Sequence, residues 1–268
     1  MKSKQSIARA ELALRELSLE VSSIRARELA IHAGLPNKLV NHIVYNFHKS
    51  HSQLQQDLIA LFLFEDTAGV FCEVGGGDGI TYSNSYLLEN LGWRGLIIEP
   101  ARGNLKKIAK NRSCDVVKKA AYSVSGLDLK FVETQNLELS TLDKFKDADI
   151  NASDRFSISA EYIVKTTSLT EVFREFNFPA NFEYLSLDTE GSELEVLKGL
   201  NFDQFTPILI TVEHNFTANR ELIFDFLSVL GYQKICSNFS RHDDWYLHVE
   251  KYSSLPKPKS LIGLVETH

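Results

Sequence analysis

Apolar residues follow two different spacings along this chain, and the spacing changes near residue 67. Before that point they recur every three or four residues, as at Leu17, Val21 and Ile24, which predicts amphipathic helices. After it, short apolar runs such as VFCEV and GLIIE alternate with helical segments such as SNSYLLENLGW. We therefore expect a helical N-terminal extension or cap over residues 1–66 and an α/β domain over residues 67–268.

This alternation of strands and helices predicts a parallel, doubly wound sheet with helices on both faces. Two apolar runs near the C-terminus, YQKICSNF and DWYLHVE, follow one another with no helix between them. Such a pair predicts an antiparallel hairpin at one edge of the sheet. DVVKKAAYS is expected to be one strand, and LDLKFVET an extra strand in the less regular region 126–180.

Composition places the chain among ordinary globular proteins. It has 268 residues, 44% hydrophobic content and a formal net charge of −6, so a global basic field for nucleic acid is not expected. No apolar stretch reaches membrane-spanning length, and the N-terminus lacks the pattern of a signal peptide. Cys72, Cys114 and Cys236 show no metal-binding spacing and indicate buried thiols in a reducing cytoplasm.

The most informative stretch is the glycine-rich turn at residues 75–79, which follows the first expected strand. In a doubly wound sheet, ligands bind beyond the carboxyl ends of the strands, so this turn is a candidate cofactor site. A dinucleotide fingerprint that begins at Gly75 would need a third glycine at the position of Ile80. The spacing present is instead E-x-G-x-G-x-G from Glu73 onward, which does not match a nicotinamide-dependent oxidoreductase.

The charge of this turn also argues against a phosphate-bearing cofactor. Glu73 and Asp78 would lie close to a pyrophosphate, and no Lys or Arg occurs between Val70 and Leu91 to neutralise them. S-adenosylmethionine has no phosphate and carries a sulfonium cation and an ammonium group, which an acidic turn attracts. The turn therefore favours S-adenosylmethionine as the cofactor.

A second acid follows the next expected strand. Glu99 lies twenty residues beyond Gly79, where a carboxylate can accept hydrogen bonds from both hydroxyls of a ribose. Both kinds of cofactor contain such a ribose, so Glu99 does not distinguish them. Asn84, at the start of the helix after the turn, is expected either to bind the cofactor's carboxylate or to cap the helix.

Three blocks of the sequence resemble the FkbM family of S-adenosylmethionine-dependent methyltransferases. They are FCEVGGGDGITYSNSYLLENLGWRGLIIEP, YLSLDTEGSELEVLKGL and ITVEHN, in that order, and the resemblance extends over residues 52–249. It implies a seven-stranded, Rossmann-like methyltransferase sheet and O-methylation of a hydroxyl on a sugar or natural product. The turn GGGDG departs from the form G-A-N-x-G that is common in this family.

The resemblance also implies roles for residues further along the chain. The pair Ala120 and Ala121 is expected near the adenine, and Asp188 near the methionine end of the cofactor and the transferred methyl group. The predicted cofactor-binding residues are Glu73, Gly75, Gly76, Gly77, Asp78, Asn84, Glu99, Pro100, Ala120, Ala121 and Asp188.

An alcohol acceptor has to lose its proton near the transition state of methyl transfer. Three residues that follow expected strands are candidates for the base, namely His214, Asp188 and Glu190. His214 comes first because the ordinary pKa of histidine lies near neutral pH, although it can also be a hydrogen-bonded residue at a strand end. Glu190 can equally serve as an acid near a helix N-terminus. No metal is expected, and His242-Asp243-Asp244 is interpreted as a polar turn rather than as a metal site.

Two other functions stay open at this point. The chain could be a binding or assembly protein that keeps the fold without catalysis, although the intact acids and glycines of the expected site argue against it. It could also be an NAD-dependent oxidoreductase, which the glycine turn disfavours. We expect a small-molecule or glycan acceptor, no nucleic acid partner, and a role of the N-terminal helices in homodimerisation or in covering the acceptor site.

Overall fold

The computed structural model describes residues 17, 19–65, 68–147, 152–153, 155 and 157–265 of the chain. A seven-stranded sheet forms its centre, and the strands in spatial order are β10 (Tyr232–Ile235), β11 (Asp243–His248), β9 (Thr206–Glu213), β8 (Asn181–Leu187), β1 (Val70–Val74), β2 (Arg94–Ile98) and β3 (Asp115–Val117). The strands from β9 to β3 are parallel, whereas β11 is antiparallel to both of its neighbours. The predicted doubly wound sheet with an antiparallel C-terminal hairpin is confirmed.

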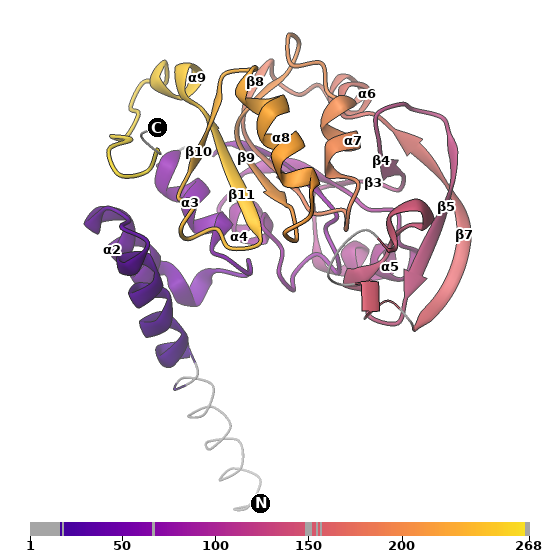
Figure 1. Cartoon of the computed structure of the whole chain (residues 1–268), viewed down its shortest axis with the longest axis horizontal. Coiled ribbons are helices and arrows are strands. Elements are labelled where there is room, and N and C mark those ends of the chain that lie inside the picture. The colour runs from indigo at the N-terminus through magenta and orange to yellow at the C-terminus, as the bar shows by residue number, and fades with distance from the viewer. Residues whose placement is uncertain are drawn as a thin grey trace, which may run out of the picture.

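Helices cover both faces of this sheet (Figure 1). One face carries α2 (Asn37–Asn46), α3 (Gln56–Leu63) and α4 (Tyr86–Asn90), and the other carries α6 (Leu169–Glu175), α7 (Glu193–Lys198) and α8 (Asn219–Ser228). Successive side chains of a strand point to opposite faces, so Phe71 and Tyr184 join the first helical layer while Cys72 and Leu185 join the second. Two further helices, α5 (Arg102–Asn111) and α9 (Val249–Ser253), follow β2 and β11.

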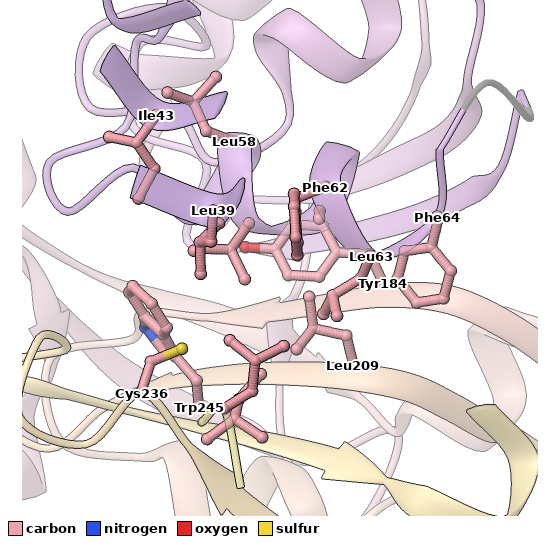
Figure 2. Packing of buried hydrophobic residues seen from close by; sticks show 14 of the residues in the cluster. Leu39, Ile43, Leu58, Phe62, Leu63, Phe64, Tyr184, Leu209, Cys236 and Trp245 are labelled. Carbon is pink, nitrogen blue, oxygen red and sulfur yellow. The ribbon is translucent and has the colours of Figure 1, made fainter. Parts of the chain in front are cut away.

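The helices before residue 66 belong to the main hydrophobic core. Figure 2 shows Leu39 of α2 and Phe62 of α3 facing Tyr184 of β8 and Trp245 of β11, and Leu58 of α3 beside Ile43 of α2. Burial of one such side chain contributes about 1.5–3 kcal/mol, so α2 and α3 stabilise the sheet that they cover. The predicted N-terminal helices are confirmed, and the domain boundary at residue 66 stays a prediction.

The first described helix, over residues 19–32, buries a different set of residues from the one that the sequence pattern predicts. Its buried residues include Ala26 and Ala30, whereas Leu17, Val21 and Ile24, which were expected to mark a buried face, are exposed. Small side chains thus make the contact with α2 and α3. No helix in the described ranges has both the length and the apolar character needed to cross a membrane.

A second, four-stranded sheet occupies the region that the sequence left irregular. Its spatial order is β4 (Ala120–Ala121), β7 (Ile158–Thr167), β5 (Asp128–Thr134) and β6 (Thr141–Leu142). The expected strand DVVKKAAYS is therefore two strands in two sheets, because the chain leaves β3 at Val117 and pairs with β7 from Ala120 onward. The expected strand LDLKFVET is β5, and the ten-residue strand β7 was not predicted.

Candidate active site

A cavity of about 500 Å³ runs along the edge of the main sheet where the parallel strands end. Each neighbouring strand contributes polar groups to its wall: the turn from Gly75 after β1, Glu99 after β2, Asp188 after β8 and Glu213 at the end of β9. Asp243 begins the antiparallel strand β11 and therefore lies at the same edge. This is the position at which doubly wound sheets bind ligands.

Most of the predicted site residues line this cavity. They are Glu73, Gly75, Gly76, Gly77, Asn84, Glu99, Pro100, Ala120, Ala121, Asp188 and Glu190. Two predicted residues, Asp78 and His214, lie outside the lining. The wall also contains groups that the sequence did not single out, among them Gln53, Gln56, Asn104, Ser186, Glu213 and Asn215.

The three glycines at the start of the turn differ in their surroundings. A Cβ atom at Gly75 would lie 1.6 Å from the carbonyl oxygen of Asp188, and one at Gly76 would lie 2.4 Å from Cγ2 of Ile97. A Cβ atom at Gly77 would meet nothing within 4 Å, and Gly77 has a positive φ of 53°. The first two glycines thus let the turn lie against the sheet, and the third presents bare backbone at the cavity wall.

Glu99 is held by backbone donors. Its Oε2 accepts a hydrogen bond from the N–H of Gly77 at 3.1 Å, and its Oε1 accepts one from the N–H of Ala101 at 2.7 Å. Burial raises the pKa of Glu99 to about 7, although these bonds favour the ionised form. The carboxylate therefore has a fixed orientation in the cavity wall, which is what recognition of a pair of hydroxyls requires.

Glu73 has a different part in the site. It accepts hydrogen bonds from the N–H of Asn84 at 2.6 Å and from the hydroxyls of Ser83 and Ser85, and it forms a buried ion pair with Arg112. Its oxygens therefore hold the chain that enters α4. Arg112 was not predicted, because it comes from the end of α5, 39 residues away in sequence.

Asp78 and His214 are engaged in local structure. Asp78 Oδ1 accepts hydrogen bonds from the N–H groups of Ile80 and Thr81 at 2.9 and 2.7 Å, which stabilises the end of the glycine turn. The Nδ1 atom of the buried His214 accepts the N–H of Phe216 at 3.0 Å, and burial lowers the pKa of His214 to about 4. His214 is thus a neutral, buried side chain outside the cavity lining at physiological pH.

The turn before β11 contributes to both sides of the sheet. His242 and Asp243 line the cavity, where Nε2 of His242 lies 3.0 Å from Oε1 of Gln53 and Oδ2 of Asp243 accepts from Nε2 of Gln56 at 2.7 Å. Asp244 points away and pairs with the cations of α8 and β10, Arg220 and Lys234.

These contacts favour the interpretation of His242-Asp243-Asp244 as a polar turn. Because Gln53 and Gln56 come from the segment that leads into α3, the N-terminal region also provides part of the cavity wall.

Three acids gather where β8 and β9 end. Oxygen atoms of Asp188, Glu190 and Glu213 lie within 4.8 Å of one another, a spacing at which carboxylates can hold a cation. Arg155 already forms an ion pair with Glu190. Such acidic groups are common without an ion, and we assign no metal to this one.

Two amide oxygens in the cavity wall fit a ligand that carries hydrogen-bond donors. Oδ1 of Asn84 and Oδ1 of Asn104 are buried and have no hydrogen-bond partner among the described residues. An unpaired buried acceptor of this kind costs about 1–3 kcal/mol, which a donor on a ligand would remove. Ammonium, hydroxyl and amino groups, all present in S-adenosylmethionine, are suitable donors.

Strand order and cavity position define a doubly wound α/β protein with a cavity at the carboxyl ends of the parallel strands, where proteins of this class bind their ligands. Residues 73–250, about two thirds of the 268-residue chain, match the model of the methyltransferase FkbM domain. The chain belongs to this family of methyltransferases. A search of curated protein sequences gives no match.

Solved structures with a similar arrangement include several methyltransferases. Ribosomal protein L11 methylase from Lactobacillus delbrueckii subsp. bulgaricus has 11% identity and a TM-score of 0.36, with 72% of this chain and 75% of that chain covered. The C-terminal domain of precorrin-6Y C5,15-methyltransferase from Rhodobacter capsulatus has 16% identity and a TM-score of 0.32, with 69% and 79% covered. Likeness at this level carries no information about the acceptor.

Proposed function

We propose that this protein transfers the methyl group of S-adenosylmethionine to a hydroxyl of a small molecule or glycan. The observation that carries the proposal is the charge of the cavity. The described residues of its lining include no Lys or Arg, and they include seven carboxyl groups, those of Glu73, Glu99, Glu138, Asp188, Glu190, Glu213 and Asp243. Glu73 and Glu190 are paired with Arg112 and Arg155 from outside the lining, so the excess of negative charge comes from the other five. Such a wall favours a cation and disfavours the phosphates of a dinucleotide.

The residues around the glycine turn suit the nucleoside and amino acid parts of this cofactor. Glu99 would accept hydrogen bonds from the ribose hydroxyls, and the bare backbone of Gly77 allows close approach. Pro100, Ala120 and Ala121 offer apolar surface for an adenine. When bound, the cofactor supplies an activated methyl group, and the protein's task is to align it with the acceptor oxygen and to remove the acceptor's proton.

The acceptor would occupy the other end of the edge, toward β9 and β11. Gln53, Gln56, Asn215 and His242 supply amide and imidazole groups there, and the ring of Phe216 is exposed beside them. Planar polar side chains with one exposed ring suit a ligand that carries several hydroxyls. This arrangement supports a small polyhydroxylated acceptor.

Thermal unfolding with S-adenosylhomocysteine, and with NAD as the comparison, tests the proposal. A ligand at a hundred times its Kd stabilises the folded state by about 2.7 kcal/mol, so the Tm should rise by about 5 °C or more with S-adenosylhomocysteine and not with NAD. Stabilisation by NAD alone would show an oxidoreductase. No shift with either compound would favour a binding or assembly protein without cofactor.

A further inference from the structure

Asp188 and Glu213 come together because they follow neighbouring parallel strands in register. Leu187 of β8 is paired with Val212 of β9, so the next residue on each strand carries its carboxylate to the same place at the sheet edge. Both side chains line the cavity, and their oxygens lie within 4.8 Å of one another. Two carboxylates at this spacing repel each other, so their approach favours a proton on one of them.

The groups that surround this pair leave its charge uncompensated. Among the described residues, no Lys or Arg forms an ion pair with Asp188 or Glu213. The neighbouring cation, Arg155, is bound to Glu190, and Asn215 Nδ2 donates to Glu213 Oε2 at 2.8 Å as a neutral partner.

The other titratable groups that face the pair are acids. Glu193 of α7 accepts from the N–H groups of Thr189 and Gly191, and Asp243 of β11 accepts from Gln56. Burial raises the pKa of both Asp188 and Glu213; repulsion from Glu190 raises that of Asp188 further, and repulsion from Asp188 raises that of Glu213. Two carboxyl groups in such a setting titrate as a unit, and the second proton is released only at a higher pH than usual.

We infer that Asp188 and Glu213 share one proton and together form the base that takes the proton of the acceptor hydroxyl. This inference rests on the proposed function and names the group that the reaction still lacks. Glu99 follows β2, which is two strand spacings, about 10 Å, from β8 and Asp188 and three from β9 and Glu213, so a nucleoside whose ribose lies at Glu99 would direct its remaining atoms toward the pair. His214, the first candidate from the sequence, lies outside this wall.

The pair would keep the charge of the site balanced through the reaction. It releases its shared proton to solvent when a cation binds beside it. During transfer the bond between sulfur and the methyl carbon breaks, its electron pair stays on sulfur, and the methyl carbon bonds to the acceptor oxygen. The proton of that hydroxyl moves to the Asp188–Glu213 pair, so the loss of the positive charge on sulfur coincides with the loss of one negative charge on the protein.

This mechanism makes a prediction that needs no knowledge of the acceptor. S-adenosylmethionine carries the positive sulfur and S-adenosylhomocysteine does not, so only the former should displace the shared proton. Calorimetric titration at pH 7 in two buffers of different ionisation enthalpy measures the protons released by each compound. We expect S-adenosylmethionine to release about 0.5–1 proton more than S-adenosylhomocysteine, because an opposite charge within about 4–6 Å lowers a carboxyl pKa by about 1–3 units.

Protons that other groups release on binding of either compound cancel when S-adenosylhomocysteine is subtracted from S-adenosylmethionine. Glu99, with its pKa of about 7, faces the ribose that both compounds contain, so its contribution cancels in the difference. Asp243 also has a pKa raised to about 7, and Asp243→Asn tests it directly. The titrations contain EDTA, so that no divalent cation occupies the acids.

Two substitutions locate the proton on the pair, and two others are controls. The double substitution Asp188→Asn with Glu213→Gln should remove the difference between the two compounds, since no carboxyl group of the pair is then left to release a proton, and each single substitution should reduce it. Glu138→Gln, in the cavity wall beside the small sheet, and Asp243→Asn should keep it. Binding of S-adenosylhomocysteine by each variant verifies that the variant is folded.

Equal proton release by both compounds in the unaltered protein would overturn the inference, whatever the variants do. So would a difference that persists undiminished in the double variant Asp188→Asn with Glu213→Gln, or one that appears only when Mg²⁺ replaces EDTA, which would identify a metal site instead. If neither compound binds, the proposed function itself fails, and that outcome is distinct from binding without a difference in protons.

Discussion

Gly75 and Asp188 pack backbone against backbone, and a Cβ atom on Gly75 would lie 1.6 Å from the carbonyl oxygen of Asp188. The N–H of Asp188 also donates to the carbonyl of Val74 at 3.0 Å. The ends of β1 and β8 are therefore in direct contact. This contact fixes the distance between the glycine turn, where the nucleoside is expected, and the carboxylate of Asp188 that we propose as part of the base.

Replacement of two glycines in the turn should have very different effects on stability. Gly75→Ala, which meets Asp188 and has a φ of 83°, should lower the free energy of unfolding by about 3 kcal/mol or more. Gly77→Ala, with a φ of 53° and open space around it, should cost about 1–2 kcal/mol. Urea unfolding followed by circular dichroism measures both losses, and equal losses would contradict the packing.

Glu99→Gln should weaken the binding of S-adenosylhomocysteine. Loss of a charge-assisted acceptor costs about 2–3 kcal/mol, or about 30- to 150-fold in Kd, by calorimetry at pH 8. Because the pKa of Glu99 is about 7 and the ionised form is the better acceptor, affinity should rise as the pH increases through 7. Glu138→Gln is the matched control, and an equal loss in both variants would remove Glu99 from the ribose site.

Removing only one partner of the ion pair between Glu73 and Arg112 should destabilise the protein more than replacing both partners. Arg112→Met leaves the buried carboxylate of Glu73 without its cation and should lower the free energy of unfolding by about 3–5 kcal/mol. Glu73→Gln in the same chain should restore part of the loss, because the buried charge of Glu73 is then removed. Glu89, which also pairs with Arg112, keeps the N–H donors of Ser113 and Cys114. A double variant as unstable as Arg112→Met, measured by urea unfolding, would argue against the pair.

Asp188→Asn should stabilise the free protein at alkaline pH. The raised pKa of Asp188 and Glu213 means that the folded state binds protons more tightly than the unfolded state, so stability falls as the pH rises from about 4 through the raised values. Removal of one carboxyl group should therefore add about 1–3 kcal/mol at pH 8 and little at pH 4.

The matched control is Asp128→Asn, which removes an exposed carboxylate paired with Lys165 and should change stability little at any pH. Chemical unfolding at the two pH values provides the measurement. An Asp188→Asn variant that is less stable than the parent at pH 8 would show that the carboxylate is compensated in a way that the contacts do not indicate.

Much of the sheet and of the nucleoside end of the cavity could be predicted from the sequence. Apolar runs mark the buried parallel strands, and residues that directly follow such strands meet at one edge, which brings the glycine turn, Glu99 and Asp188 together. Both signals are local in sequence, so they can be recognised without knowledge of tertiary contacts.

Other features depend on contacts between distant segments. The strand β7 pairs with β4 and β5, and its alternating exposed residues resemble those of a loop. Arg112 reaches Glu73 only after α5 has packed. Near the end of β9 the side-chain alternation decides which residue faces the cavity, and it turns Glu213 inward and His214 away.

The bonds from Gln53 and Gln56 to the turn before β11 have a consequence for comparing family members. Both glutamines lie upstream of residue 73, where the family match begins, yet they touch the end of the cavity that would receive the acceptor. Exchange of the short segment that carries them could therefore alter substrate choice while residues 73–250, which match the family model, are left unchanged.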